Sequence, residues 1–559
     1  MSMVVAPVNT WQGAPAATTA GFRDYLRFIW HRNWVRGLVW FIVIVGMVAF
    51  IADYYQTIFT TPDDLRGFAD IAQAPSMAAL VGVIDNPATM GGAIWCKGWM
   101  FLSLMLGIGM VYLMTRNLRG DEDAGRLELM RAYPLGAHSP MASSVVLTAA
   151  VCVASGIFSA LALIGLGVGN AMGDIPATGN GGAWAFGASI AVMGLLGVGI
   201  AAVTNQVAPS GGAANGLGIG VFIVFYVIRM VGDLQGIRAL LWVSPIGWGE
   251  LVDPWSANRV LPIVLSAVLA IVLVAIGWAI ESRRDMGAGM VAQRAGAAHA
   301  SKLTQTVAGL GARTQRASIV VWCIGMVFFG ALLGSVITKM YGLLQGSGLN
   351  SAFASSANAT VAMVLSMIAL AVGIFAVQSA SALRSDEERG VLEAQLAGGV
   401  SRLGWALRRL GVTLVSVVVL LALCGYIVGA VSSSSPPVAD PNNPGVMLAA
   451  VGVGTALGAV FAHLPAIIIL MGVAVLGFGW WPKVATPVVW GVVGALWAVV
   501  IIGVALRLPS WVMNGLPFIG GPHLPSESMN WAKDGIFLAV GLVFIVVGLI
   551  GFRRRDVPA

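Results

Sequence analysis

Charged side chains are scarce in this sequence. Asp, Glu, Lys and Arg make up 10% of its 559 residues, whereas 58% of the residues are hydrophobic. Soluble domains contain about 25% charged and about 45–50% apolar residues, so a soluble core cannot bury this much apolar surface. The apolar residues also form long continuous runs instead of alternating with polar ones, which excludes a transmembrane β-barrel. The composition therefore predicts an all-α polytopic membrane protein.

Residues that carry hydrolytic or metal chemistry are also few. None of the five lysines follows a glycine, so there is no Gly-Lys-Ser/Thr loop to hold nucleotide phosphates. The five histidines form no His-Glu-x-x-His pair, and the four cysteines have no Cys-x-x-Cys spacing. We therefore expect no catalytic residue, metal or cofactor on this chain. Any ATP and Mg²⁺ that it uses should bind to a partner chain.

The basic residues do not form one patch, although the net charge is +7. They lie at the ends of the apolar runs, where Lys and Arg mark the cytoplasmic side of a membrane protein. We therefore expect no nucleic-acid partner. The same rule predicts a multi-pass protein of the cytoplasmic membrane, in contact with lipid, with both termini in the cytoplasm.

Twelve apolar segments are long enough to cross a bilayer, and they fall into two sets of six. The first set lies in residues 37–280 and the second in residues 317–559. The tenth segment is interrupted by His463-Leu464-Pro465. We read it as one broken span, because two spans would place the basic C-terminal end outside. The predicted spans are 38–52, 93–115, 141–168, 184–204, 217–231, 260–280, 319–338, 360–383, 405–431, 447–481, 488–506 and 535–552.

The remaining segments have distinct compositions. Residues 1–20 are rich in Ala, Thr and Pro, which predicts disorder, and residues 21–36 fit an interfacial helix. Residues 281–316 are basic and rich in Gly and Ala, which predicts a cytoplasmic linker between the two halves. Residues 234–258 and 511–530 contain Trp and Pro, and they predict short re-entrant or cap helices on the exoplasmic side.

One motif occurs twice. The segment RGDEDAGRLELMR (Arg119–Arg131) follows the second span, and RSDEERGVLEAQ (Arg384–Gln395) follows the eighth. Six of the ten positions from Arg119 to Glu128 are identical in the second copy. A repeat of this length indicates two copies of one membrane unit. We call the two segments repeat loop 1 and repeat loop 2.

The composition of repeat loop 1 predicts one short amphipathic helix. Its acidic residues stand near the helix start, where they favour the positive end of the helix dipole. Glu122 and Arg126 have the i, i+4 spacing of an ion pair, and Leu127 and Met130 form an apolar edge. The alternative is a solvated loop that only obeys the positive-inside rule, but such a loop does not require the same pattern in both copies.

At these residues the chain resembles a known family. The repeat loops resemble the E-x-x-G-x-L-E-x-L element of type-2 ATP-binding-cassette exporter permeases, with Met130 and Gln395 at the last Leu. The two halves end in RRDMGAG (Arg283–Gly289) and FRRRD (Phe552–Asp556). This duplicated twelve-span form is similar to actinobacterial antibiotic and multidrug exporter permeases of the tetronasin-resistance type.

The resemblance implies that the repeat loops are cytoplasmic coupling helices. Each would contact one of two copies of a separate ATP-binding-cassette ATPase chain, with ATP and Mg²⁺ on those subunits. It also makes residues 21–36 the connecting helix and the two caps external gate helices. The residues implied in ATPase coupling are Glu122, Gly125, Arg126, Leu127, Glu128, Glu387, Gly390, Leu392 and Glu393.

The resemblance further places a substrate path along the second and fifth spans of each half. Aromatic and Met side chains there suit a hydrophobic small molecule, and the alternative for each is ordinary helix packing. Arg229 has Asp233 four residues later, so a structural ion pair is equally compatible. The implied path residues are Trp99, Met105, Phe222, Phe225, Tyr226, Arg229, Met363, Phe375, Trp490 and Trp497.

These observations favour the permease subunit of an ATP-driven exporter. Its substrates would be hydrophobic or amphipathic compounds such as antibiotics, drugs or lipids, taken from the cytoplasm or inner leaflet. A proton-coupled secondary transporter is the alternative, because such proteins also have six plus six spans and a Gly-Asp…Gly-Arg loop after the second span. A membrane-embedded enzyme has support only from the Asp-bearing loop at 53–92.

Overall fold

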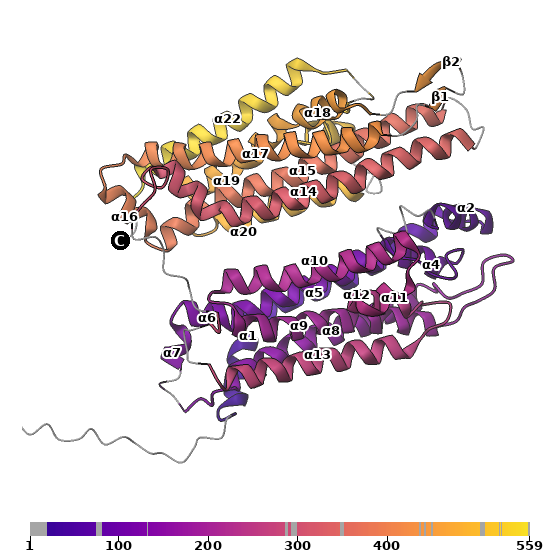
Figure 1. Cartoon of the computed structure of the whole chain (residues 1–559), viewed down its shortest axis with the longest axis horizontal. Helices are drawn as coiled ribbons and strands as arrows, with labels where there is room; N and C mark the ends of the chain where they lie inside the picture. The colour runs from indigo at the N-terminus through magenta and orange to yellow at the C-terminus, as the bar shows by residue number, and fades with distance from the viewer. Residues whose placement is uncertain are drawn as a thin grey trace, which may run out of the picture. The chain divides into compact units, whose positions relative to one another are not determined.

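The chain folds into two compact units, seen in a computed structural model (Figure 1). Unit 1 is Met1–Ala295 and unit 2 is Gly296–Ala559, so the division falls inside the predicted linker. The described residues are 19–73, 81–130, 132, 134–284, 289–291, 299–346, 352–434, 438–440, 443–448, 451–502, 509–524, 526 and 528–556. The predicted disorder of residues 1–20 falls almost wholly outside these ranges.

Unit 1 is a bundle of long helices with short helices at its ends. Residues 234–258, which the sequence predicts to be a helical cap, contain α11 and α12. The elements are α1 (Phe22–Ile58), α2 (Pro62–Ala72), α4 (Met90–Ile94), the π-helix η1 (Trp95–Trp99), α5 (Met100–Asn117), α6 (Arg119–Asp123), α7 (Arg126–Met130), α8 (Ser139–Gly165), α9 (Gly181–Val207), α10 (Gly211–Gln235), α11 (Arg238–Val243), α12 (Pro245–Leu251) and α13 (Val260–Glu281).

Unit 2 is also a bundle of long helices. Its described residues also include an antiparallel hairpin, β1–β2, which follows the predicted ninth span. The elements are α14 (Val307–Gly346), α15 (Ala352–Glu388), α16 (Val391–Ala397), α17 (Arg402–Ser433), β1 (Val438–Asp440), β2 (Asn443–Leu448), α18 (Val453–Ala462), α19 (Leu464–Trp480), α20 (Ala485–Ile502), α21 (Ser510–Gly515) and α22 (Trp531–Arg554).

Eleven helical segments in the described ranges are long and apolar enough to cross a membrane. This confirms a polytopic membrane protein. Unit 1 has six such segments and unit 2 has five, while α20 contributes a shorter apolar stretch, Ala485–Trp497. The exact twelve-span form is therefore not confirmed. Residues 503–506 of the predicted eleventh span lie outside the described residues.

The tenth segment has its predicted break. α18 ends at Ala462 and α19 begins at Leu464, and together they form one candidate span, Val453–Trp480. Pro465 stands in the first turn of α19, where its missing N–H leaves no hydrogen bond unmade. His463 Nδ1 donates to the Ala459 carbonyl at 3.0 Å, and its Nε2 lies within hydrogen-bond distance of the Ser366 hydroxyl, also at 3.0 Å, so the break is connected to α15.

Residues 21–36 do not form a separate helix. α1 runs without interruption from Phe22 to Ile58, through the predicted boundary at residue 37 and through the first predicted span. The physical reason is the absence of a helix breaker: the segment contains no Pro, and Gly37 only lets Val151 approach closely. The amphipathic part and the apolar part are thus one continuous helix.

Close glycine contacts hold α19 against α22. A Cβ added at Gly479 would lie 2.0 Å from the Gly548 carbonyl oxygen, and one at Gly472 would lie 2.7 Å from that of Gly541. The two contacts are seven residues apart on each helix, so they repeat every two turns along one interface. Small residues at such positions let membrane helices approach closely enough for van der Waals packing.

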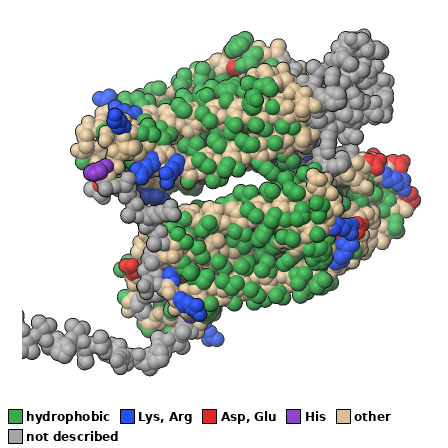
Figure 2. Space-filling model, viewed as in Figure 1, with side chains coloured by type: hydrophobic (Ala, Val, Ile, Leu, Met, Phe, Trp, Pro, Cys, Tyr) green, Lys and Arg blue, Asp and Glu red, His purple; other side chains and the backbone are tan. Residues whose placement is uncertain are grey.

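Polar and apolar side chains are segregated along each unit. In unit 1, α6 and α7 lie at the end of the bundle opposite α2 and α4, and in unit 2, α16 lies at the end opposite the β1–β2 hairpin (Figure 1). Hydrophobic side chains cover the visible flank of each unit, and Lys and Arg gather near the ends (Figure 2). Each repeat loop is therefore at one polar end of its own unit, outside the apolar flank.

Candidate functional site

Repeat loop 1 forms two short helices, not the single helix that its sequence predicts. α6 ends at Asp123 and α7 starts at Arg126, with Gly125 between them at φ +66°. An L-residue with a side chain rarely adopts this left-handed conformation. The turn separates Glu122 from Arg126, and the predicted pair between them is replaced: Arg126 Nε lies 2.9 Å from Asp121 Oδ1.

Repeat loop 2 has the same turn at the same motif position. Here α15 continues through Glu388, Gly390 follows at φ +68°, and α16 begins at Val391. A Cβ added to Gly125 or Gly390 would meet no atom within 4 Å. The motif glycine is therefore required for its backbone conformation and not for space.

The first glutamate of the motif is buried in an arginine pair in unit 1. Arg119 Nη1 donates to Glu122 Oε2 at 2.9 Å, and Arg284 Nη2 lies 2.8 Å from Oε1 and 2.9 Å from Oε2. The Glu122 side chain is 6% exposed and that of Arg119 is 1% exposed. Arg284 follows the end of α13, 162 residues along the chain, so this contact fastens α6 to the last membrane helix of unit 1.

Unit 2 contains the same three-residue arrangement. Arg384 Nη1 lies 3.2 Å from Glu387 Oε2, and Arg555 contacts Glu387 through both terminal nitrogens, at 2.5 and 2.7 Å. Arg555 directly follows α22, as Arg284 follows α13. Its guanidinium also stacks over the Phe478 and Phe552 rings. We call the Arg119–Glu122–Arg284 and Arg384–Glu387–Arg555 groups clamp 1 and clamp 2.

Clamp 1 extends to the start of the fifth membrane helix. Arg119 Nη2 donates to the Pro209 carbonyl at 2.9 Å, and the Gly211 N–H donates to Asp123 Oδ2 at 2.7 Å. Gly211 is the first residue of α10. α6 therefore joins the neighbouring ends of α5, α10 and α13 through charged hydrogen bonds, which are stronger than neutral ones.

The aspartate of the motif ties each loop to a further helix. Asp121 is 1% exposed and accepts from Arg32 of α1 at 2.6 Å. Its counterpart Asp386 accepts from Arg409 of α17, which also donates to Thr314 of α14 at 3.1 Å. The position is shared, but it connects to different helices in the two units.

The structure divides the predicted coupling residues by their exposure. Glu122, Leu127, Glu387 and Leu392 face the interior, with Leu127 6% and Leu392 0% exposed. The second motif glutamate is exposed in both copies, as Glu128 and Glu393. Repeat loop 1 also exposes Arg126 and, at 76%, Leu129, which the sequence analysis did not select. Contact of any of these residues with an ATPase stays a prediction.

Several predicted path residues are packed inside their own units. Trp99 is fully buried, stacks on Trp95 at 5.2 Å and donates to Ser189 Oγ at 2.7 Å. Phe222 fills the space above Gly107. Phe375 is fully buried against Trp322. Packing accounts for these three rings.

Other predicted path residues keep some exposure. Met105, Phe225, Tyr226 and Trp497 are half-buried and Trp490 is 40% exposed. The Met363 side chain lies outside the described residues. A substrate role for these residues stays a prediction.

Arg229 belongs to a buried charge cluster that includes an unpredicted residue. Its Nη2 lies 2.6 Å from Asp233 Oδ2, and its Nε lies 3.0 Å from Glu250 Oε2 on cap helix α12. The Val83 N–H donates to Glu250 Oε1 at 2.7 Å. Burial raises the pKa of Glu250 to about 8, because the effect of burial and of the nearby Asp233 carboxylate exceeds the lowering by Arg229. The cluster holds α10, α12 and the segment at Val83 together.

Both caps insert an aromatic side chain at a left-handed backbone position. Trp255 (φ +61°) and Phe518 (φ +71°) each follow a proline and are 2% exposed. The Trp255 indole lies over Gly91 and Gly182, where an added Cβ would be 2.2 and 2.3 Å away. Residues with large side chains rarely adopt this conformation, so packing holds it in place.

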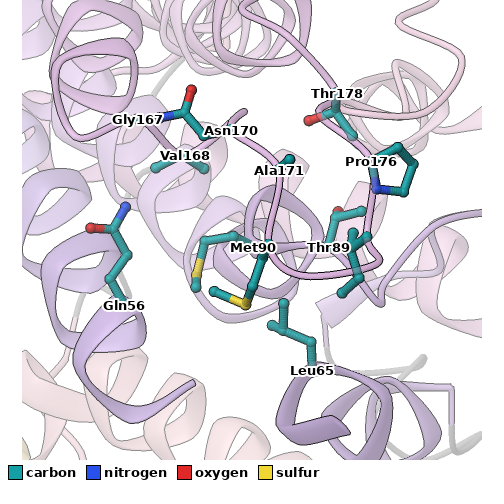
Figure 3. A pocket seen from close by; sticks show the side chains of 12 residues that line it. Gln56, Leu65, Thr89, Met90, Gly167, Val168, Asn170, Ala171, Pro176 and Thr178 are labelled. Carbon is teal, nitrogen blue, oxygen red and sulfur yellow. The ribbon is translucent and has the colours of Figure 1, made fainter. Parts of the chain in front are cut away.

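A cavity of about 260 Å³ lies beside the C-terminal end of α1 in unit 1 (Figure 3). Gln56 of α1, Leu65 of α2 and the loop after α8 line it, and Gln56 Nε2 donates to the Leu166 carbonyl at 2.7 Å. None of the predicted path residues lines this cavity. In the described ranges, no group of three or more His, Cys, Asp or Glu side chains is placed to hold a metal ion.

The contacts that sequence reasoning missed are those between distant segments. The sequence shows Arg284 and Arg555 as the repeated ends of the two halves, and their spacing of 271 residues is close to the 265 between the repeat loops. That near-equality was the available signal that each arginine belongs with its own loop. Glu250 carried a weaker signal, as the one acidic residue among the Trp and Pro residues at 234–251.

Comparison with known proteins gives two similarities. Residues 304–553 match the family described as the C-terminal domain of the multidrug efflux system permease Rv1217c. The chain is 28% identical to the multidrug efflux system permease protein Rv1217c of Mycobacterium tuberculosis (strain ATCC 25618 / H37Rv), over 96% of this chain and 95% of that protein. This similarity spans both units. It supports a transporter permease and not an enzyme.

Proposed function

We propose that this chain is the membrane subunit of an exporter that separate ATPase chains energise through the two repeat loops. ATP binding and hydrolysis by the partners would move the exposed parts of the loops, and the membrane helices of each unit would follow. The chain itself would supply the substrate path and the outer caps. ATP and Mg²⁺ would bind to the partners, and both termini would lie in the cytoplasm.

The observation that carries the proposal is the exposed surface that both repeat loops present at equivalent positions. Each loop turns at a left-handed glycine and then exposes a glutamate in the first turn of a short helix, Glu128 in α7 and Glu393 in α16. In α7 the next residue, Leu129, is 76% exposed. Each exposed glutamate stands on a short helix next to a loop that buried ion pairs hold in place, which suits a charged docking contact with a protein.

We infer the substrate class from the apolar side chains of the membrane helices and from the name of the similar protein. The protein of Mycobacterium tuberculosis is named a multidrug efflux permease. In this chain, aromatic and Met side chains at half-buried positions of α5 and α10 adapt to varied apolar shapes. We therefore expect hydrophobic or amphipathic small molecules, moved out of the cytoplasm or inner leaflet.

Charge reversal of the exposed glutamates tests the coupling role. Glu128→Arg combined with Glu393→Arg should reduce ATP-driven dye uptake into inverted membrane vesicles at least tenfold, because opposed like charges at an interface cost several kcal/mol. Asp24→Arg combined with Asp556→Arg is the matched control, since both are exposed acids outside the repeat loops. The amount of permease in the membrane should be the same in both. Uptake equal to that of the control would contradict the proposal.

The same vesicles separate the two energy sources. ATP should support uptake when an ionophore has abolished the proton gradient. Uptake that needs the gradient and continues after ATP depletion would instead identify a proton-coupled secondary transporter.

A further inference from the structure

We propose that Arg284 and Arg555 are positioning residues that transmit movement of each repeat loop to the last membrane helix of its own unit. The inference rests on the proposed function, because it concerns how an ATPase-driven movement reaches the membrane. It assigns the buried half of the repeated motif to transmission and the exposed half to docking. Nothing in the motif itself distinguishes these two roles, since both halves contain a glutamate.

Each clamp attaches at the ends of two membrane helices of its own unit. Glu122 lies on α6, three residues before Gly125, and Arg284 lies just after α13. Glu387 and Arg555 occupy the corresponding places in unit 2, at the ends of α15 and α22. Each clamp thus joins the end of the second membrane helix to the end of the last one, immediately beneath the exposed part of the loop.

The contact between the glutamate and the last-helix arginine of each clamp is stiff. The clamp glutamates are 6% and 2% exposed, and the last-helix arginines are 10% and 16% exposed, so water has little access to the contacts. Charged hydrogen bonds in such surroundings have few alternative partners. A displacement at α7 or α16 is therefore passed on to α13 or α22 instead of being absorbed by a loose loop.

Both clamps keep this geometry in different surroundings. Arg119 of clamp 1 also binds the Pro209 carbonyl before α10, whereas Arg555 of clamp 2 stacks on Phe478 and Phe552. The motif aspartates connect to α1 in unit 1 and to α17 in unit 2. The shared element is the tie between the loop and the last helix.

The clamps also provide a variant that removes the tie without leaving a buried unpaired charge. Glu122 keeps Arg119 and Glu387 keeps Arg384 when the third residue is replaced. Arg284→Met and Arg555→Met retain an unbranched side chain but cannot hold the carboxylate. Arg283 and Arg554 are the preceding, exposed arginines in the same repeat, so Arg283→Met with Arg554→Met is a control with the same change of charge.

The experiment measures three quantities on the intact complex of permease and ATPase in proteoliposomes. These are dye transport per ATP hydrolysed, the amount of ATPase that co-purifies, and the midpoint of thermal unfolding. For the double variant we expect transport per ATP to fall at least tenfold, because each clamp loses the charged hydrogen bonds from its last-helix arginine. Co-purified ATPase should equal that of the control. A role in folding alone would lower the yield and the midpoint but leave transport per ATP unchanged.

Two outcomes overturn the inference. Transport per ATP equal to that of the Arg283→Met, Arg554→Met control shows that the tie does not transmit movement. Loss of co-purified ATPase with unchanged transport per ATP makes the clamp part of docking. If the double variant does not fold, the single variant Arg555→Lys replaces it. Lysine keeps the charge but cannot contact Glu387 through two nitrogens. The same fall in transport per ATP is then expected from a change in unit 2 alone. Wild-type transport that does not depend on ATP defeats the proposed function itself, and the inference fails with it.

Discussion

At the scale of single residues, four of the six positions shared by the repeat loops meet four different physical requirements. The first glutamate is buried between two arginines, and the glycine adopts a left-handed backbone conformation. The leucine is buried in the unit, while the second glutamate is exposed. The two loops therefore share these four residues for four reasons: charge burial, backbone geometry, packing and exposure. A different substitution can test each requirement.

The motif glycines provide a test of backbone geometry. Gly125→Ala and Gly390→Ala should each lower the free energy of unfolding by about 1–2 kcal/mol, because a side chain disfavours the left-handed conformation even where space is open. Gly46→Ala in the middle of α1 also meets no atom within 4 Å and should be neutral or stabilising. Thermal unfolding of the purified protein in detergent measures all three. Equal effects of Gly125→Ala and Gly46→Ala would show that the turn is not required.

Glu250 provides a test of pH dependence. Burial raises the pKa of Glu250 from 4.5 to about 8 in the folded protein. Between these values the unfolded chain loses a proton that the folded chain keeps, so the stability that this group contributes falls as the pH rises. The unfolding midpoint of the wild type, relative to that of Glu250→Gln, should therefore decrease from about pH 5 to about pH 8.

A matched control comes from an exposed carboxylate whose pKa is shifted in the opposite direction. The hydroxyl and N–H of Thr61 lower the pKa of Asp64, so its effect on stability lies below this pH window. The difference between wild type and Asp64→Asn should be constant from about pH 5 to about pH 8. A constant difference for Glu250→Gln as well would mean that Glu250 does not titrate within the cluster.

At the scale of helices, packing in unit 2 depends on close approach of α19 and α22. A Cβ added at Gly548 would lie 2.5 Å from the Val475 carbonyl oxygen, so Gly548→Ala should cost about 1–3 kcal/mol of stability by overpacking. Gly535→Ala in the same helix meets no atom within 4 Å and should be tolerated. The midpoint of thermal unfolding distinguishes them. Full tolerance of Gly548→Ala would mean that the two helices are not packed at this distance.

The helices themselves could largely be predicted from the sequence, because long apolar runs leave few alternatives in a bilayer. The break at His463 was also predictable, since Pro465 suits only the first turn of a new helix. The continuity of α1 was not. A change from amphipathic to apolar composition at residue 37 marks a change of surroundings, and a helix can pass through such a change when no residue breaks it.

The candidate site could be predicted only in part. The repeat located both loops, and the family resemblance selected residues within them. The orientation of those residues depends on contacts over large sequence distances, such as Arg284 with Glu122 and Arg555 with Glu387. Local spacing instead suggested a pair between Glu122 and Arg126, which the turn at Gly125 prevents. Spacing rules for a helix do not apply where a glycine ends it.

At the scale of the whole molecule, the two units share a plan but differ in detail. Both have a repeat loop, a clamp and a cap with a buried aromatic residue. The buried cluster of Arg229, Asp233 and Glu250 belongs to unit 1, and the corresponding predicted span at 488–506 contains no charged residue. We therefore expect the proposed substrate path to differ between the two units near this cluster.

The central claim is that a separate ATPase drives this permease. The most direct measurement begins with purification of the tagged chain in mild detergent. Mass spectrometry then identifies each co-purifying soluble chain and its number of copies per permease, and the eluate is assayed for ATP hydrolysis. The proposed function predicts an ATPase at two copies per permease, released by Glu128→Arg with Glu393→Arg. A pure permease with no ATPase activity, from cells in which it transports dye, would contradict the claim.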